Sequence, residues 1–350
     1  MIKMHLSSVD IGMYIAKPVY DDAGKLLIDK GNMLKKQYIS KLVNYGIEYI
    51  YVEWDKKSNY AEIISKETTK EALRDIEKFM KSFNYFDTDK YDKIVKIVND
   101  IITKLLSKKN IILYVTDIRG IDDYTFQHSL YVCVYALVIG VELNYSKQQL
   151  EDLGIGALLH DVGKVLTPSS ILKKPSILNS CEYEEIKKHS TEGYNIIKYI
   201  DGVSEDSCII VRDHHERYDG TGYPSGLKGK EIHEYARIVA ICDVFDALTS
   251  NRPYREKISP HNAIEYIVAL GNKQFDLEIL KVLLKRINIY PIGTHVLLES
   301  GDKGVVIEAN LELPTRPIIQ VYSDYKNANR RSRIIDLKKQ LKNSIRKVLA

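Results

Sequence analysis

The sequence predicts a mainly α protein, in which a helical bundle follows a small α/β unit and precedes a small β appendage. From residue 110 to about residue 290 the apolar residues follow an almost wholly helical pattern. Residues 1–56 mix short β-branched runs with one helical segment, and residues 291–350 hold β-branched runs separated by glycine and proline. With 350 residues, 45% of them apolar, the chain is long enough for about two domains.

The N-terminal unit, residues 1–56, is predicted to contain a hairpin, a helix and a strand. Tyr14–Tyr20 and Lys25–Ile28 flank Asp21-Asp22-Ala23-Gly24, which is a turn-forming sequence. A helix is expected over Lys35–Asn44 and a strand over Glu48–Glu53. Residues 57–109 are charged and periodic, and we expect them to form a helical linker whose helices could pair two chains into a homodimer.

The bundle, residues 110–290, shows clear helix starts. Ser146 and Gln149 have the spacing of a capping box, and the helix that they open is expected to run to His160-Asp161. Ser259-Pro260 has the pattern of an N-cap followed by proline in the first turn. In residues 291–350, strands are expected over His295–Leu298, Val305–Ile307 and Ile318–Val321, and the basic tail Lys338–Lys347 is predicted to be a solvated helix face.

Several functional classes are disfavoured by composition. The longest apolar stretch, Tyr131–Val141, is shorter than the ~20 residues that a membrane span needs, and the N-terminus does not resemble a signal peptide. The four cysteines form no C-x-x-C pair, which argues against a thiolate site. A net charge of +4 is too small to indicate nucleic-acid binding by bulk charge. We therefore expect a cytoplasmic protein with no membrane span and no nucleic-acid partner.

Histidines and aspartates in the bundle form the candidate site. Taken singly, each histidine is better explained as a hydrogen-bonded structural residue. Asp243 is harder to explain in that way, because a carboxylate within an apolar helix is costly unless it is paired or binds a metal. The candidate set is His128, His160, Asp161, His189, His214, His215 and Asp243.

Together these residues suggest a metal centre. Imidazoles and carboxylates without thiolates suit Mn, Fe, Ni or Zn. One aspartate can bridge two ions, and two ions ~3.5–4 Å apart can activate a bridging hydroxide for in-line attack on a phosphodiester. Lys164 follows Asp161 by three residues, so on a helix it would share the same face and could neutralise a phosphate. An exposed lysine is the alternative explanation.

At these residues the chain resembles the HD-GYP family of bacterial phosphodiesterases. His160-Asp161-Val162-Gly163-Lys164 matches the HD…K element, and residues 214–224, HHERYDGTGYP, match the element that names the family. Residues 243–255, from Asp243 through Asp246 to Arg255, match a further DxxDAxT…RPYR segment. The resemblance covers roughly residues 105–290.

The resemblance implies an HD-type helical bundle that hydrolyses cyclic di-GMP to linear pGpG by attack of a metal-bridging hydroxide. It implies two divalent transition metal ions, Fe or Mn, held by the seven candidate residues with Asp161 as the bridge. Lys164 would contact the scissile phosphate, and Arg252 and Arg255 would hold substrate phosphates. The Gly220–Pro224 loop, with Tyr223, would help to shape the substrate groove.

Two departures and two alternatives accompany this interpretation. Tyr124 stands where some relatives have a glutamate that helps to bind a third metal, so we expect two ions and pGpG as the product. Ser190 replaces a proline common after the histidine, and should not affect ligation. The chain could instead be a cyclic di-GMP receptor without turnover, or an HD-type hydrolase of another nucleotide, such as a hybrid cyclic dinucleotide.

Overall fold

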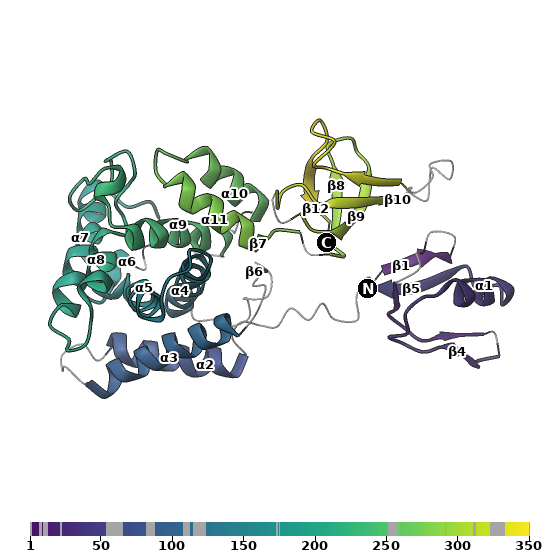
Figure 1. The fold of residues 1–350 in the computed structure, drawn as a ribbon, viewed down its shortest axis with the longest axis horizontal. Helices are drawn as coiled ribbons and strands as arrows, with labels where there is room; N and C mark the ends of the chain where they lie inside the picture. The colour runs from purple at the N-terminus through teal and green to yellow at the C-terminus, as the bar shows by residue number, and fades with distance from the viewer. Residues whose placement is uncertain are drawn as a thin grey trace. The chain divides into compact units, whose positions relative to one another are not determined.

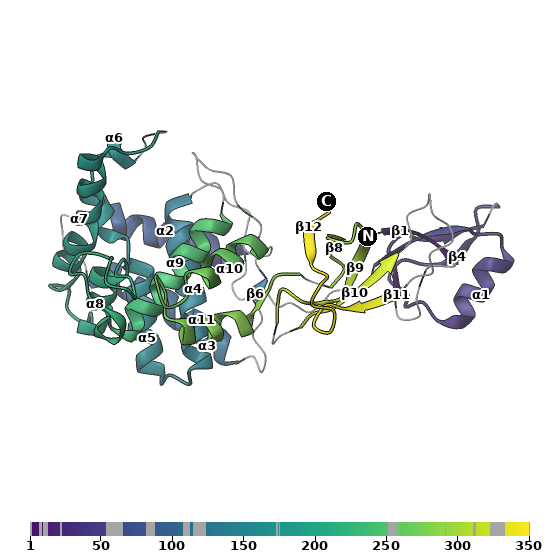
Figure 2. The same ribbon diagram turned by 90° about the horizontal axis from the view of Figure 1, so that it is seen from above.

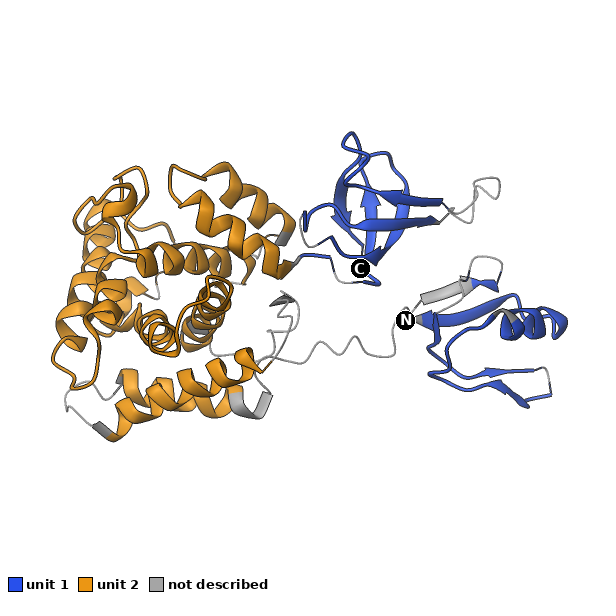
Figure 3. Cartoon of the chain, viewed as in Figure 1, with its two compact units in different colours: residues 1–61, 288–350 blue, residues 62–287 orange. Residues whose placement is uncertain are grey.

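The computed structural model describes most of the chain and divides it into two units. The described residues are 2–6, 9, 13–21, 23–53, 66–81, 88–107, 113–114, 124–172, 174, 176–250, 258, 260–290, 292–310, 313–322 and 333–349. Unit 1 comprises Met1–Ala61 together with Asn288–Ala350, and unit 2 comprises Glu62–Ile287 (Figure 3). Unit 2 contains all seven candidate metal ligands.

The N-terminal part of unit 1 is a three-stranded sheet, ordered β1-β5-β2, with one helix and a hairpin. Its elements are β1 (Ile2–His5), β2 (Tyr14–Ile15), β3 (Val19–Tyr20), β4 (Leu26–Ile28), α1 (Lys36–Asn44) and β5 (Tyr49–Glu53). Met13, Ile15, Leu34 and Leu42 form part of its buried core.

The predicted hairpin is confirmed, because β3 pairs with β4 across the expected turn. The single strand expected over Tyr14–Tyr20 is instead broken into two, at Ala16-Lys17-Pro18. Proline there lacks the N–H that a continuous ladder needs.

The C-terminal part of unit 1 is a five-stranded antiparallel sheet, ordered β11-β10-β9-β8-β12. Its strands are β8 (His295–Leu298), β9 (Lys303–Glu308), β10 (Ile318–Tyr322), β11 (Arg333–Asp336) and β12 (Ile345–Val348). The helix predicted for the basic tail is wrong, because β12 pairs with β8 and turns precede it. Ile345 is buried while Arg346 and Lys347 are exposed, so one apolar anchor fixes an otherwise basic edge strand.

Unit 2 is a helical bundle, which confirms the mainly α fold class (Figures 1 and 2). Its α-helices are α2 (Lys66–Lys81), α3 (Thr88–Leu106), α4 (Tyr124–Glu142), α5 (Lys147–Leu159), α6 (Ser169–Leu172), α7 (Ser180–Ile197), α8 (Glu205–Asp213), α9 (Glu234–Thr249), α10 (Pro260–Ala269) and α11 (Leu277–Arg286). It also contains two 3-10 helices, η2 (Val162–Leu166) and η3 (Gly229–Glu231). The short strand β6 (Leu113–Tyr114) pairs with β7 (Ile287–Asn288), which begins at the last residue of this unit.

Helix α4 lies at the centre of the bundle. Its residues from His128 to Gly140 are buried on every side, as expected of a helix without a polar face. Helix α5 packs beside it, and a Cβ at Gly154 would lie 2.6 Å from Val98 of α3. The predicted capping box at Ser146 and Gln149 is confirmed and begins α5. Among the described residues, no helix has the length and apolarity required to cross a membrane.

Candidate metal centre

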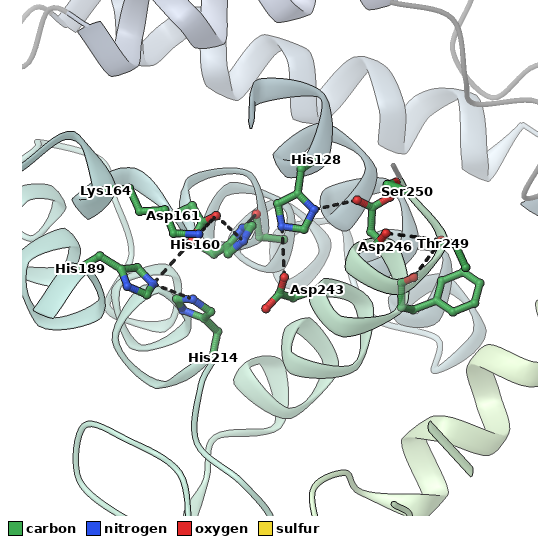
Figure 4. Close-up of polar contacts among 12 residues, drawn as sticks. His128, His160, Asp161, Lys164, His189, His214, Asp243, Asp246, Thr249 and Ser250 are labelled. Atoms are coloured by element: carbon green, nitrogen blue, oxygen red, sulfur yellow. Dashed lines mark hydrogen bonds and ion pairs between the residues drawn. The ribbon is translucent and has the colours of Figure 1, made fainter. Parts of the chain in front are cut away.

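The seven candidate ligands lie together in two groups. One group contains Asp161, His189, His214 and His215, and the other contains His128, His160 and Asp243. Within each group, one ligand atom per residue lies within 4.8 Å of every other. The ligands come from α4, α7 and α9 and from the residues that directly follow α5 and α8. Figure 4 shows that the labelled side chains His128, His160, Asp161, His189, His214 and Asp243 lie close together. The sequence pattern thus named residues that the fold brings into one cluster.

Helix ends supply several of these ligands. His160 caps the C-terminus of α5, Asp161 precedes η2, and His214 caps the C-terminus of α8. His128 lies in the second turn of α4, and Asp243 lies within α9. The last carbonyl groups of a helix have no partner within the helix, so an imidazole at the helix end can donate to one of them, as His160 and His214 do.

Main-chain carbonyls fix the orientation of three imidazoles. The Nδ1 atoms of His160, His189 and His214 lie 2.8, 2.6 and 3.0 Å from carbonyl oxygens three residues earlier in the chain. A carbonyl can only accept, so each Nδ1 must carry the proton. In the neutral ring, Nε2 then carries a lone pair that points into the cluster, which is the form of histidine that binds a metal.

Asp161 lies between the two groups. Its Oδ2 is 3.4 Å from His160 Nε2, and its Oδ1 is 3.5 Å from His189 Nε2. One carboxylate therefore offers an oxygen to each group, as a bridging ligand does. The Lys164 ammonium lies 2.6 Å from Asp161 Oδ2 and is 31% exposed, so it can also reach a molecule that approaches from solvent.

The arrangement of nitrogen atoms fits cations. His189 Nε2 and His214 Nε2 lie 3.3 Å apart, although each is the unprotonated nitrogen of a neutral ring. Two lone pairs facing each other at this distance repel unless a cation binds both. His160 Nε2 is also buried and has no hydrogen-bond partner. Buried polar atoms are rarely left in that state, so the clusters fit a divalent metal site.

The titration of the group around Asp161 agrees with metal binding. Burial lowers the pKa of His189 to about 4 and that of His215 to about 3. Burial likewise lowers the pKa of His214. These rings are therefore neutral near pH 7 and available as ligands. Burial acts to raise the pKa of Asp161, but Lys164 and the neighbouring histidines outweigh it and leave that pKa well below its usual value.

Sequence reasoning did not assign a role to Asp246. Its Oδ2 lies 2.7 Å from His128 Nδ1, and its carboxylate also accepts a hydrogen bond from Ser250 (Figure 4). Asp243 Oδ1 lies 3.1 Å from the other ring nitrogen, Nε2. Asp246 thus orients His128 toward Asp243. The available signal was a second carboxylate three residues after Asp243 in the same apolar helix.

Two glycines let the helices approach closely enough to form the centre. A Cβ at Gly163 would lie 1.9 Å from the carbonyl oxygen of His189, so η2 contacts the backbone of α7. A Cβ at Gly156 would lie 2.4 Å from Ile210, where α5 crosses α8. The first contact brings Asp161 to His189, and the second brings His160 to His214.

The predicted Gly220–Pro224 loop lies beside His215. The Tyr223 ring packs on the His215 ring with centroids 4.8 Å apart. The buried Glu216 carboxylate accepts hydrogen bonds from three backbone N–H groups, those of Ser225, Gly226 and Leu227, and so fixes the loop. Three other residues named from the sequence cannot be placed in the same way. Arg252 and Arg255 lie outside the described residues, as does the side chain of Tyr124.

Comparison with known proteins identifies two regions of the chain. A model of the HD domain matches residues 100–279, just over half of the chain. A model of the KOW domain associated with HD domains matches residues 295–350. The second region coincides with strands β8–β12.

Several curated proteins are similar to this chain. Cyclic di-GMP phosphodiesterase PA4108 of Pseudomonas aeruginosa is 35% identical over 226 residues, which cover 65% of this chain and 54% of the relative. The 3′3′-cGAMP-specific phosphodiesterase 1 of Vibrio cholerae is 38% identical over 170 residues, which cover 48% of this chain and 39% of the relative. The chain thus spans about half of the relatives' length or less.

Among solved structures, the HDG"Y"P protein Bd1817 of Bdellovibrio bacteriovorus matches with a TM-score of 0.48 and 17% identity. The match covers 81% of this chain and 97% of that chain. The sequence matches provide the firmer assignment. The HD domain model spans more than half of the chain and includes all seven clustered ligands, so the chain belongs to the HD domain family.

Proposed function

We propose that the chain is a metal-dependent phosphodiesterase that opens cyclic di-GMP to linear pGpG. The observation that carries this proposal is the position of Asp161, whose Oδ1 lies 3.5 Å from His189 of one ligand group and whose Oδ2 lies 3.4 Å from His160 of the other. The Lys164 ammonium lies at the same Oδ2. The names of the relatives from Pseudomonas aeruginosa and Thermotoga maritima, both cyclic di-GMP phosphodiesterases, support the substrate.

Each of the two ligand groups would hold one metal ion. His128, His160 and Asp243 would hold one divalent transition metal ion, Fe or Mn, and His189, His214 and His215 would hold the second. Asp161 would contribute one oxygen to each. When bound, two such ions act as Lewis acids toward a phosphodiester. They also lower the pKa of bound water, so that hydroxide is available as the nucleophile near neutral pH.

The remaining residues would bind and orient the substrate. Lys164 can turn its ammonium from Asp161 toward a phosphate oxygen, because it is part-exposed and its stem is flexible. There it would stabilise the negative charge that grows on phosphorus oxygens during attack. Arg252 and Arg255 would bind phosphate groups, and Tyr223 would line the groove beside His215.

The test is turnover of cyclic di-GMP by protein purified without oxygen and loaded with Fe or Mn. We expect the wild type to produce pGpG, and Asp161→Ala to lose more than about 100-fold in kcat, because each ligand group loses one Asp161 oxygen. Asp201→Ala, which changes an exposed aspartate in a turn, is the matched control. Activity that survives in Asp161→Ala would refute the mechanism.

The number of ions and the product are linked in this proposal. With Tyr124 in place of a glutamate, we propose two ions per chain and pGpG rather than GMP as the main product. Metal analysis of the same preparation measures the ratio. A stoichiometry near three ions per chain, or GMP as the accumulating product, would refute this part.

A hybrid cyclic dinucleotide is the second candidate substrate. It is favoured by three Vibrio cholerae relatives that are named 3′3′-cGAMP-specific phosphodiesterases and are 38%, 34% and 38% identical. Competition between cyclic di-GMP and 3′3′-cGAMP in one reaction gives the ratio of their kcat/KM values directly. Tight binding of cyclic di-GMP without turnover by the metal-loaded protein would instead indicate a receptor.

A further inference from the structure

Aromatic and charged side chains continue outward from the metal centre. Tyr223 packs on His215, with the two ring planes tilted by 30°. The Tyr223 ring therefore lies in direct contact with one of the proposed metal ligands. A substrate held at the centre by a phosphate can therefore contact this ring.

Lys187 lies against two tyrosine rings at this place. Its Nζ is 4.9 Å from the centroid of the Tyr183 ring and 5.6 Å from that of Tyr223. Both distances fall within the range of a cation–π contact. Tyr183 and Lys187 are four residues apart on α7, so they share one face of the helix. Tyr183 is 46% exposed, which leaves much of its ring available to a ligand.

An acidic partner accompanies this lysine. Glu184 Oε1 lies 2.7 Å from Lys187 Nζ, and the glutamate is 66% exposed. An ion pair so exposed adds little stability, so a ligand can part the two groups at small cost. Because Lys187 is positive and Glu184 is negative, the pair has no net charge. The pair is therefore better suited to a neutral polar molecule than to a phosphate.

We propose that Tyr183, Glu184, Lys187 and Tyr223 form a binding site for a guanine base, next to the metal centre. The inference rests on the proposed function, because the base would belong to the cyclic dinucleotide whose phosphate lies at the metals. The exposed tyrosine ring offers a stacking surface, which every base can use. Lys187 and Glu184 supply the discrimination between bases.

The hydrogen-bonding groups of guanine match this pair. Guanine presents O6 and N7 as acceptors, and lysine is one of the residues that bind them. Its N1–H and N2 amino group are donors, which a carboxylate such as that of Glu184 accepts. Adenine places an amino group where guanine has O6, so the lysine ammonium would face a donor. The site should therefore favour cyclic di-GMP over cyclic di-AMP, with the hybrid dinucleotide between them.

The test compares three substrates in wild type and variants. In Lys187→Met the aliphatic stem stays over the rings but the donor is lost. We expect its kcat/KM for cyclic di-GMP to fall about tenfold, mainly through KM, while the value for cyclic di-AMP changes little. Lys187→Arg should restore the preference. Lys188→Met, which removes the neighbouring lysine paired with Glu185, is the matched control.

Tyr183→Leu separates stacking from base recognition. Because stacking is indifferent to base identity, we expect it to raise KM for cyclic di-GMP and cyclic di-AMP by similar factors. If Lys187→Met lowers kcat/KM for all three substrates equally, or changes none of them, the guanine site is refuted while the phosphodiesterase proposal stands.

Bis(p-nitrophenyl) phosphate, a diester without a base, reports on the metal centre itself. A wild type that hydrolyses it but none of the cyclic dinucleotides would refute the proposed function, and the guanine site with it. A Lys187→Met protein that loses this activity as fully as cyclic di-GMP turnover would show damage to the centre. That result would also overturn the role assigned to Lys187.

Discussion

The Asp246 carboxylate lies 2.7 Å from His128 Nδ1. This ring is thus held by a side chain, whereas the Nδ1 atoms of His160, His189 and His214 contact main-chain carbonyls. A carboxylate in this position fixes the ring and makes its other nitrogen a stronger ligand. We expect Asp246→Asn to weaken metal binding by about 10- to 100-fold while the protein stays folded.

Competition with a chromogenic chelator measures this affinity. Ser250→Ala removes a hydrogen bond to the same carboxylate and should change the affinity by less than about threefold, since the Asp246–His128 contact remains. Equal affinities in wild type and Asp246→Asn would show that Asp246 does not position His128.

The metal-free protein should have a pH-dependent stability that originates in His128. Burial alone would lower the pKa of this ring, but its contacts with Asp243 and Asp246 outweigh burial and raise it to about 9. The folded state thus keeps a proton that the unfolded chain releases near pH 6.5. The resulting stability is complete below pH 6.5 and is lost as the pH rises to about 9, with a slope of up to about 1.4 kcal/mol per pH unit.

The other histidines act in the opposite direction. Burial lowers the pKa of His189 to about 4 and that of His215 to about 3. Below pH 6.5 the unfolded chain therefore binds protons at these histidines that the folded state does not bind. Stability should therefore also fall as the pH drops below 6.5. Urea unfolding of chelator-treated protein between pH 5 and 9 measures both slopes. His128→Gln should abolish the alkaline one, and a flat wild-type profile from pH 6.5 to 9 would contradict this account.

At the scale of elements, the contact between η2 and α7 assembles the centre. We expect Gly163→Ala to destabilise the protein by about 2–4 kcal/mol and to weaken metal binding, because the new methyl group would displace the His189 backbone. Gly140→Ala is the matched control. The three atoms nearest to its Cβ are two leucine methyl groups and a tyrosine ring carbon, which can move more easily than backbone. Thermal unfolding and metal content of both variants provide the measurement.

Individual elements were predictable where a local signal defines them. The Ser146 capping box gave the start of α5, and the Asp21–Gly24 turn gave the hairpin of β3 and β4. The basic tail could not be predicted in this way, because β12 exists through its pairing with β8, which is about 50 residues earlier in the chain. Charge periodicity carries no information about such a partner.

The site itself was predictable as a set of residues, but not as a geometry. The spacing of His160, Asp161 and the His214-His215 pair, together with the family resemblance, named every member of the two ligand groups. The role of Asp246 and the approach of Gly163 to α7 depend on how separate helices pack. A single sequence does not contain that packing, so these residues emerged from the structure.

At the scale of the whole molecule, the ligands and the groups that orient them all lie within Glu62–Ile287. We expect this fragment, produced alone, to unfold cooperatively and to bind the same amount of metal per chain as the full-length protein. Helices α3, α5, α9 and α11 all pack against the buried helix α4, which supports independent folding. Calorimetry and metal analysis test this expectation. A soluble fragment that binds no metal, beside a full-length chain that does, would contradict it.

The carbonyl contacts of His160, His189 and His214 have a further consequence, for heat resistance. Each ring is held by the helix turn that carries it, so its orientation survives changes in neighbouring side chains but not fraying of that turn. His160 and His214 stand at helix ends, where fraying begins. Warming should therefore loosen the ions before the bundle melts, and bound ions should in turn hold these helix ends closed.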